Sequence, residues 1–309
     1  MPEQPDPDAP GSWPYHMRRG EFAEAWAVSD ADLRARAGQP CYHWPRHLQY
    51  VWSGQPLAGQ RVLVRCYHGL GDTIQFVRYL PLLQEVAAQV LVWAQPELLP
   101  LLATAPGIDQ LLPLHDGTPD AAYDADVEIM ELPHIFRTTL ATLPAPLPYL
   151  HVPPRRLAAA GRRAVGLVWQ AGNWDARRSV PFALLAPLAQ VPGVELLILQ
   201  ANAEAAGWQP GVGVHPGEFD LYEYARVVRG LDLLITVDSM PAHLAGALGV
   251  PVWTLLHAHA DWRWLAPSRP DSPWYPTMRL FWQEQPGEWA PVVARVAREL
   301  RALTPAPCG

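Results

Sequence analysis

Short apolar runs alternate with segments of helical periodicity along most of the chain. The run Arg61–Cys66 predicts a buried strand, and the apolar positions after it recur at helical spacing, which predicts a helix over Asp72–Ala88. The same alternation continues downstream. Further strands are expected at 90–93, 110–112 and 126–130, and further helices at 97–103 and 133–143.

A cluster of prolines at positions 144, 146, 148, 153 and 154 precedes a second alternating half. Strands are expected there at 164–169, 194–199, 231–237 and 250–255, and helices at 182–190, 221–229, 241–248 and 289–303. Strands that alternate with helices predict parallel sheets with right-handed crossovers. The pattern therefore predicts an α/β protein with two parallel-sheet domains.

The N-terminal 60 residues show a different pattern. Residues 1–12 are acidic and proline-rich and are expected to be disordered, 15–36 has helical character with a break at Gly20, and 38–60 is an aromatic connector. We expect three regions: 1–60 with the tail, a helical hairpin and the connector; 61–155 as the first domain; and 156–309 as the second.

Composition narrows the class of protein. Half of the 309 residues are hydrophobic, and the net charge of -7 argues against a general nucleic-acid binder. The chain has no lysine, so arginine is its main cationic residue. Arginine suits bidentate contacts with phosphate, but a general compositional bias explains the absence of lysine better. The three cysteines show neither metal spacing nor a disulfide framework. With no signal peptide and no apolar run of about 18 residues, we expect a cytoplasmic protein without a membrane span.

The turn after the first strand carries candidate chemistry. Gly69, Gly71 and Asp72 lie where a strand meets a helix, at the carboxyl edge of the predicted sheet, where open α/β folds bind ligands. Ile74 replaces the third small residue of a dinucleotide fingerprint, so that function is disfavoured. Asp72 could accept a proton from a substrate, or it could only cap the helix.

Two candidate phosphate-binding segments follow strands of the second domain. The first is the loop 169–179, with Gly172 and Asn173 for close backbone approach and Arg177 and Arg178 as cations. The second is 238–243, a strand end that opens a helix, where free N–H groups and the helix dipole attract a diphosphate. Each residue also has an ordinary structural role available.

A metal centre is not expected. His257, His259 and Asp261 are closely spaced, but no further histidine follows them to complete a ligand set.

These segments, in this order, resemble glycosyltransferase family 9, the ADP-heptose:lipopolysaccharide heptosyltransferase-like proteins, and especially the branch fused to tetratricopeptide repeats. The resemblance rests on GLGDTIQFVRYLPLL from Gly69, VGLVWQAGN from Val165, RRSVPFALLAPL from Arg177, DLLITVDSMPAHLAGALGVPVW from Asp232, and the later DWRWL and DSPWYPTMRLFWQ. RRGEFAEAW from Arg18 resembles one hairpin of the repeat region.

The resemblance implies a GT-B architecture, in which two Rossmann-like domains face a cleft and the final helix packs back on the first domain. It implies inverting, metal-independent transfer of a sugar from a nucleoside-diphosphate sugar to an acceptor hydroxyl, without a cofactor. Asp72 would be the base. The nucleotide-sugar site would comprise Gly172, Asn173, Arg177, Arg178, Gln200, Asp238, Ser239, Met240 and His243, and the acceptor side Gly69, Gly71 and Gln75.

The chain departs from the family pattern at two places. Ser239, Met240 and Pro241 follow the motif aspartate, and a proline cannot donate an N–H to phosphate. Tyr67 and His68 are unusual before the glycine turn, so acceptor recognition is open.

Other functions also stay open. A glycan, a lipopolysaccharide-type molecule or a protein could be the acceptor, and peripheral membrane association is open. The main alternative is a non-catalytic sugar-nucleotide-binding or scaffold module. A sugar-nucleotide epimerase is a second alternative, and a dehydrogenase is the least favoured. The sequence does not specify the donor base, its sugar or the oligomeric state.

Overall fold

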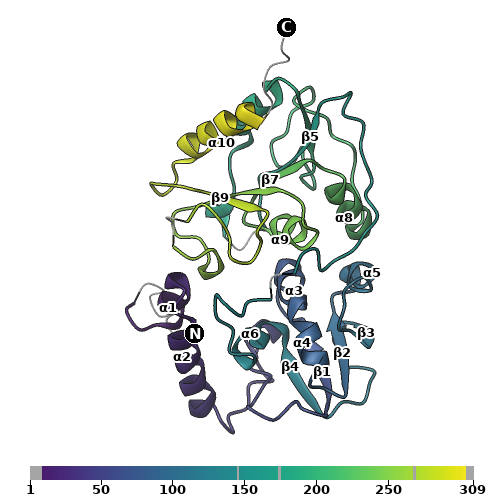
Figure 1. Ribbon diagram of the computed structural model, residues 1–309, viewed down its shortest axis with the longest axis vertical. Coiled ribbons are helices and arrows are strands. Elements are labelled where there is room, and N and C mark those ends of the chain that lie inside the picture. The colour runs from purple at the N-terminus through teal and green to yellow at the C-terminus, as the bar shows by residue number, and fades with distance from the viewer. Residues whose placement is uncertain (1–8, 145, 173–174, 267–268, 304–309) are drawn as a thin grey trace. The chain divides into compact units, whose positions relative to one another are not determined.

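The computed structural model describes residues 9–144, 146–172, 175–266 and 269–303. The chain divides into two compact units (Figure 1). Unit 1 holds Met1–Leu150 and Asp261–Ala266, and unit 2 holds His151–Ala260 and Pro267–Gly309. The N-terminal helices and connector, which we expected to form a separate region, therefore belong to unit 1, and the division at 150/151 lies five residues before the expected one.

Unit 1 is built on a parallel sheet with the strand order β3-β2-β1-β4. Its strands are β1 (Arg61–Arg65), β2 (Gln89–Ala94), β3 (Gln110–Pro113) and β4 (Ala125–Glu128). All four were predicted. The register pairs Arg65 with Glu128, so the ends of β1 and β4 are neighbours at one edge of the sheet. The turn with Asp72 starts from this edge.

After β1, the helices of unit 1 are shorter than the sequence predicted. They are α1 (Trp13–Arg19), α2 (Phe22–Ala35), α3 (Leu70–Phe76), α4 (Leu80–Gln84), α5 (Leu99–Leu102) and α6 (Leu132–Ile135). The helix predicted over 72–88 is interrupted by a 3-10 turn before α4, where Pro81 has no N–H for the preceding turn. The helix predicted at 133–143 is wrong in extent, because Arg137 adopts a left-handed conformation (φ 50°) that ends α6.

Unit 2 contains a five-stranded parallel sheet with the order β6-β5-β7-β8-β9. Its strands are β5 (Arg163–Val168), β6 (Val194–Ile198), β7 (Leu233–Val237), β8 (Val252–Leu256) and β9 (Met278–Trp282). The first four were predicted, and the edge strand β9 was missed. Its helices are α7 (Phe182–Leu185), α8 (Leu221–Arg229), α9 (Met240–Ala247) and α10 (Trp289–Leu303).

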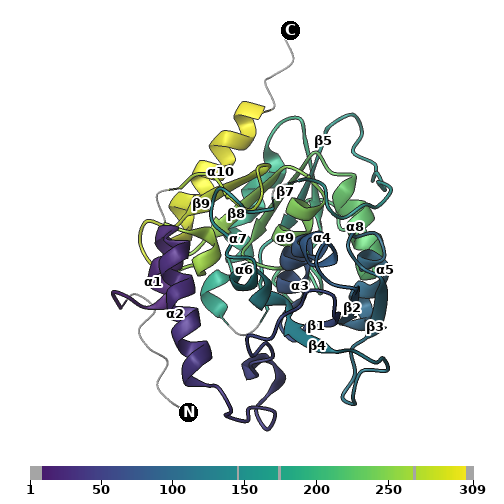
Figure 2. The same ribbon diagram turned by 60° about the horizontal axis from the view of Figure 1, so that its bottom comes forward.

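The final helix α10 has the predicted bounds. Trp289, Val292 and Val296 lie in the same core as the strands of unit 2, and α10 contacts α7 and β9 (Figure 2). Its packing on the first domain stays a prediction. Unit 1 also includes Asp261–Ala266, a segment from the C-terminal half of the chain.

Membrane-spanning helices were not expected, and in the described ranges every helix is too short or too polar to cross a bilayer.

Candidate functional site

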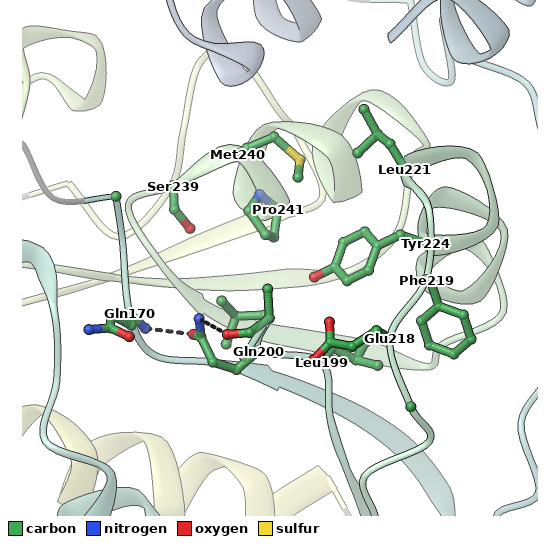
Figure 3. A pocket seen from close by; sticks show the side chains of 14 residues that line it. Gln170, Leu199, Gln200, Glu218, Phe219, Leu221, Tyr224, Ser239, Met240 and Pro241 are labelled. Atoms are coloured by element: carbon green, nitrogen blue, oxygen red, sulfur yellow. Dashed lines mark hydrogen bonds between the residues drawn. The ribbon is translucent and has the colours of Figure 1, made fainter. Parts of the chain in front are cut away.

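A pocket of about 320 Å³ opens at the carboxyl edge of the sheet of unit 2. One side of the pocket is formed by residues at and after the ends of β5, β6 and β7. The other side is formed by the segment before α8 and by α8 itself (Figure 3). The lining residues include Gln170, Gly172, Leu199, Gln200, Glu218, Phe219, Leu221, Tyr224, Ser239, Met240 and Pro241. Of the predicted nucleotide-sugar residues, four line this pocket: Gly172, Gln200, Ser239 and Met240.

One wall of the pocket is mainly apolar. In Figure 3 the ring of Tyr224 points toward Ser239 and Pro241, and Phe219 and Leu221 come from the same side of the pocket as Tyr224. The Tyr224 hydroxyl is buried and has no hydrogen-bond partner among the described residues. Burial, together with the nearby Glu218 carboxylate, raises the pKa of Tyr224, so the group is a neutral phenol that can donate a hydrogen bond. Such a wall suits a flat ring with polar edges.

Gln200 shapes the pocket by holding the loop after β5. Its Oε1 accepts the N–H of Trp169 at 3.1 Å and that of Gln170 at 2.8 Å (Figure 3). Its Nε2 donates to the carbonyl of Ala201 at 3.2 Å. The Gln200 amide thus joins the backbone that follows β5 to the backbone that follows β6.

Arg177 and Arg178 have different environments. Arg178 is buried (8% exposed); its Nη1 donates to the Asp238 carbonyl at 3.0 Å and its Nη2 to the Gly172 carbonyl at 3.4 Å. Its charge is therefore fixed between the loops that follow β5 and β7. Arg177 is exposed and paired with Asp175 through two bonds of 2.9 Å, which lower the pKa of Asp175. Arg178 is the better candidate for diphosphate contact.

Helix α9 starts at the pocket. Ser239 lies at its N-cap, yet its hydroxyl donates to the Val237 carbonyl at 3.2 Å rather than capping the helix. Asp238 is 6% exposed and presents its backbone carbonyl to Arg178. His243 is 3% exposed and lies 3.1 Å from the Tyr275 hydroxyl. His243 is not among the residues that line the pocket, so its approach to the donor stays a prediction, and Asn173 lies outside the described residues.

The turn after β1 presents the predicted base. The Asp72 Oδ2 accepts the N–H of Gly69 at 3.0 Å, and Oδ1 accepts from Nη1 of Arg263 at 2.7 Å. The Asp72 side chain is 20% exposed, and Gly69 is exposed while Gly71 is half-buried. Asp72 therefore caps α3, as the structural alternative held, and also remains within reach of a hydroxyl group.

Gln75 is fully buried and accepts a hydrogen bond from Nη1 of Arg263 at 3.2 Å. It cannot contact an acceptor directly, which corrects its predicted role. Arg263 itself was missed; the only signal was its place in the DWRWL segment. The pocket residues Phe219 and Tyr224 were missed because they follow no strand of the sheet.

Two further ionisable groups lie beside this turn. The His68 Nε2 is 3.8 Å from Oε2 of Glu128, a buried carboxyl at the end of β4. Burial lowers the pKa of His68 and raises that of Glu128 well above its ordinary value. Both groups are therefore held toward their neutral forms.

No group of three or more His, Cys, Asp or Glu side chains in the described ranges could hold a metal ion. The residues His257 and His259 do not converge on one point: Nε2 of His257 faces Asp175 at 3.7 Å, and its Nδ1 accepts the N–H of His259. Metal independence of the reaction stays a prediction.

Residues 196–290 match the model of glycosyltransferase family 9 (heptosyltransferase). This range contains the end of β6, all of β7 to β9 and most of the pocket lining. A curated relative, Protein FlbA of Caulobacter vibrioides, is 29% identical over 324 aligned positions, which cover 91% of this chain and 53% of FlbA. The chain thus spans about half the length of that relative.

Solved structures resemble the fold over about four fifths of this chain. A family 9 glycosyl transferase from Veillonella parvula has a TM-score of 0.58 at 15% identity, with 81% of this chain and 99% of that chain covered. TibC, an iron-containing heptosyltransferase of enterotoxigenic Escherichia coli solved with ADP-D-beta-D-heptose, has a TM-score of 0.52 at 14% identity, with 80% and 78% covered. At these identities the likeness shows the fold, which is the predicted GT-B architecture of two parallel-sheet α/β units.

Proposed function

We propose that this protein transfers a sugar from a nucleoside-diphosphate sugar to an acceptor hydroxyl group. The observation that carries the proposal is the pocket of unit 2, where a ring-sized apolar wall lies opposite the start of α9 and the fixed cation Arg178 is bound to the same strand ends. The match to family 9 over 196–290 supports the same function. So does the ADP-heptose bound to TibC, a protein of the same fold.

The proposed binding mode follows from the chemistry of the pocket. The nucleobase lies against Phe219, Leu221 and Tyr224, because aromatic and apolar side chains favour flat rings. The diphosphate lies toward Ser239 at the N-terminus of α9, where backbone dipoles favour anions. Pro241 removes one N–H from that end of the helix, so the charge of Arg178 becomes more important.

The proposed reaction inverts the anomeric centre and uses no metal. The acceptor oxygen forms a bond to the anomeric carbon from the face opposite the diphosphate, while the bond from that carbon to the diphosphate oxygen breaks. Asp72 takes the proton of the acceptor hydroxyl, and the nucleoside diphosphate leaves with the electron pair. A positioned base contributes about 10²–10⁴-fold to such a step. Arg178 stabilises the charge on the leaving group.

The acceptor and the location of the protein stay predictions from the sequence. We propose a glycan, a lipopolysaccharide-type molecule or a protein as acceptor, and a cytoplasmic location.

A matched pair of variants tests donor binding. Nucleoside-diphosphate sugars with different bases are first screened by thermal shift, and a donor at about 100 times its dissociation constant should stabilise the protein by about 2.7 kcal/mol. Arg178→Met should then weaken donor affinity at least about tenfold, or about 1.4 kcal/mol. The neighbouring Arg177→Met should change it less than about twofold, because Asp175 already neutralises that side chain.

Turnover separates transfer from binding. Donor consumption that depends on an added acceptor hydroxyl and persists in EDTA would support the proposal. Donor binding without any product would instead indicate a non-catalytic module, and conversion of the donor without acceptor would indicate an epimerase. Absence of binding by every nucleoside-diphosphate sugar would overturn the proposal.

A further inference from the structure

Segment Asp261–Ala266 is a short piece of the C-terminal half of the chain that belongs to unit 1. Aromatic packing holds it there. Trp262 meets Trp13 edge-on at 5.0 Å between ring centroids and stacks with Phe76 at 6.5 Å, and Trp264 is fully buried. Leu265 adopts φ 61°, a conformation that costs a non-glycine residue about 1–3 kcal/mol and persists only when its surroundings enforce it.

Within this segment, Arg263 is fixed from two sides. Its Nε donates to Oδ1 of Asp261 at 2.8 Å, and its Nη1 donates to Oδ1 of Asp72 at 2.7 Å and to Oε1 of Gln75 at 3.2 Å. The Arg263 residue is 8% exposed, so little water competes for these bonds. The planar guanidinium allows several donors to act in one fixed geometry.

We propose that Arg263 is a positioning residue that sets the orientation of the Asp72 carboxylate for proton transfer. The inference rests on the proposed function. Arg263 donates to Oδ1 of Asp72 and the Gly69 N–H donates to Oδ2, so rotation of the carboxylate is restricted. The Asp72 side chain is 20% exposed, and an ionised carboxylate has about four acceptor positions, so an acceptor hydroxyl would approach from the exposed side.

The placement of the reacting groups strongly affects the rate of the reaction. A displacement of about 1 Å can cost about 10²-fold in rate, and a base must lie within hydrogen-bond reach of the proton that it removes. In this arrangement the base comes from the turn after β1, and its orientation comes from a residue 191 positions later in the chain.

A double-mutant cycle tests the inference. Arg263→Met should lower kcat for transfer about 10–100-fold, with unchanged KM and binding affinity for the nucleotide sugar. The same substitution in an Asp72→Asn background should change kcat less than about threefold, because a residue that acts only through Asp72 has no effect once the base is gone. Arg263→Lys, which keeps the charge and can reach one oxygen, should recover part of the loss.

A control variant addresses general effects of removing an ion pair. Arg61→Met breaks the Arg61–Asp124 pair at the opposite end of β1 and should leave kcat within about twofold. If Arg263→Met unfolds the protein, Asp261→Asn is the alternative variant, because it weakens the support of the Arg263 guanidinium without removing its charge. We expect Asp261→Asn to lower kcat severalfold, and we expect no such loss in the Asp72→Asn background.

The possible outcomes are distinct. An Arg263→Met variant with normal kcat overturns the inference, as does an equal loss in both backgrounds, which would indicate a role independent of Asp72. Either result leaves the proposed function intact when the wild-type protein transfers sugar. A wild-type protein that binds the donor but never transfers it overturns the proposed function and the inference with it.

Discussion

Gly246→Ala tests the packing of helix α9, whose first residues line the pocket of unit 2. A Cβ atom added at Gly246 would lie 2.3 Å from Cδ1 of Tyr275 and 2.5 Å from its Cγ. Carbon atoms prefer about 3.5–4.0 Å, so the ring or the helix would have to move by more than about 1 Å. Tyr275 is fully buried and its hydroxyl lies 3.1 Å from Nδ1 of His243, so the ring cannot swing into solvent.

The expected loss of stability follows from three contributions. Overpacking a dense core costs about 1–3 kcal/mol. Displacing Tyr275 weakens its hydrogen bond to His243, worth about 1 kcal/mol. Alanine in place of glycine favours the helix by about 1 kcal/mol. We expect a net destabilisation of about 1–3 kcal/mol, and a fall of the melting temperature of unit 2 by about 2–4 °C per kcal/mol.

Calorimetry and urea unfolding measure this effect, with Gly172→Ala as the control. A Cβ atom at Gly172 would meet no heavy atom within 4 Å, so the free energy of unfolding of the Gly172→Ala protein should stay within about 0.5 kcal/mol of the wild-type value. A Gly246→Ala protein that melts at or above the wild-type temperature would refute the reasoning, because helix propensity would then outweigh the contact with Tyr275.

Three further predictions concern unit 1. Burial raises the pKa of Glu131 from 4.5 to about 7, so between these pH values the folded chain keeps a proton that the unfolded chain releases. The free energy of unfolding should therefore fall by about 3 kcal/mol as the pH rises from below 4.5 to above 7. Urea unfolding at pH 5 and pH 8 should show a smaller difference for Glu131→Gln than for the wild type, and equal differences would contradict this. The hydrogen bonds from Arg61 hold the pKa of Asp124 at about 2. In an NMR titration, Arg61→Met should raise the pKa of Asp124, but not to its ordinary value, because the backbone N–H of residue 61 still donates to this carboxylate. Trp26→Phe removes the 2.7 Å bond from Nε1 to the buried Thr138 carbonyl, and we expect a loss of about 1–3 kcal/mol in urea unfolding; unchanged stability would show that water replaces the donor.

The strands were predictable because a buried parallel strand must be apolar on both faces. The runs at β1 and β5 therefore stand out in the sequence. The edge strand β9 was missed because the surrounding tryptophans and prolines obscure its short apolar run. The break before α4 was readable in principle, since Pro81 cannot complete the preceding helical turn.

Site residues on strand ends were predicted better than residues that act from a distance. Gly172, Gln200, Ser239 and Met240 all follow strands of the sheet and all line the pocket. The position of His243 within a helical motif does not reveal which side of the helix faces the core. In α9 that side chain faces Tyr275, a residue of a distant loop.

The sequence by itself determined the alternation of strands and helices, the two parallel sheets and the edge of unit 2 at which four predicted site residues gather, because these follow from local apolar patterns and from the geometry of parallel strands. Only the tertiary structure decided that α10 belongs to the core of unit 2, that Gln75 is buried, and that Arg263 holds Asp72. Such contacts join residues far apart in the chain, and their energy depends on burial and distance in three dimensions, which no local pattern records.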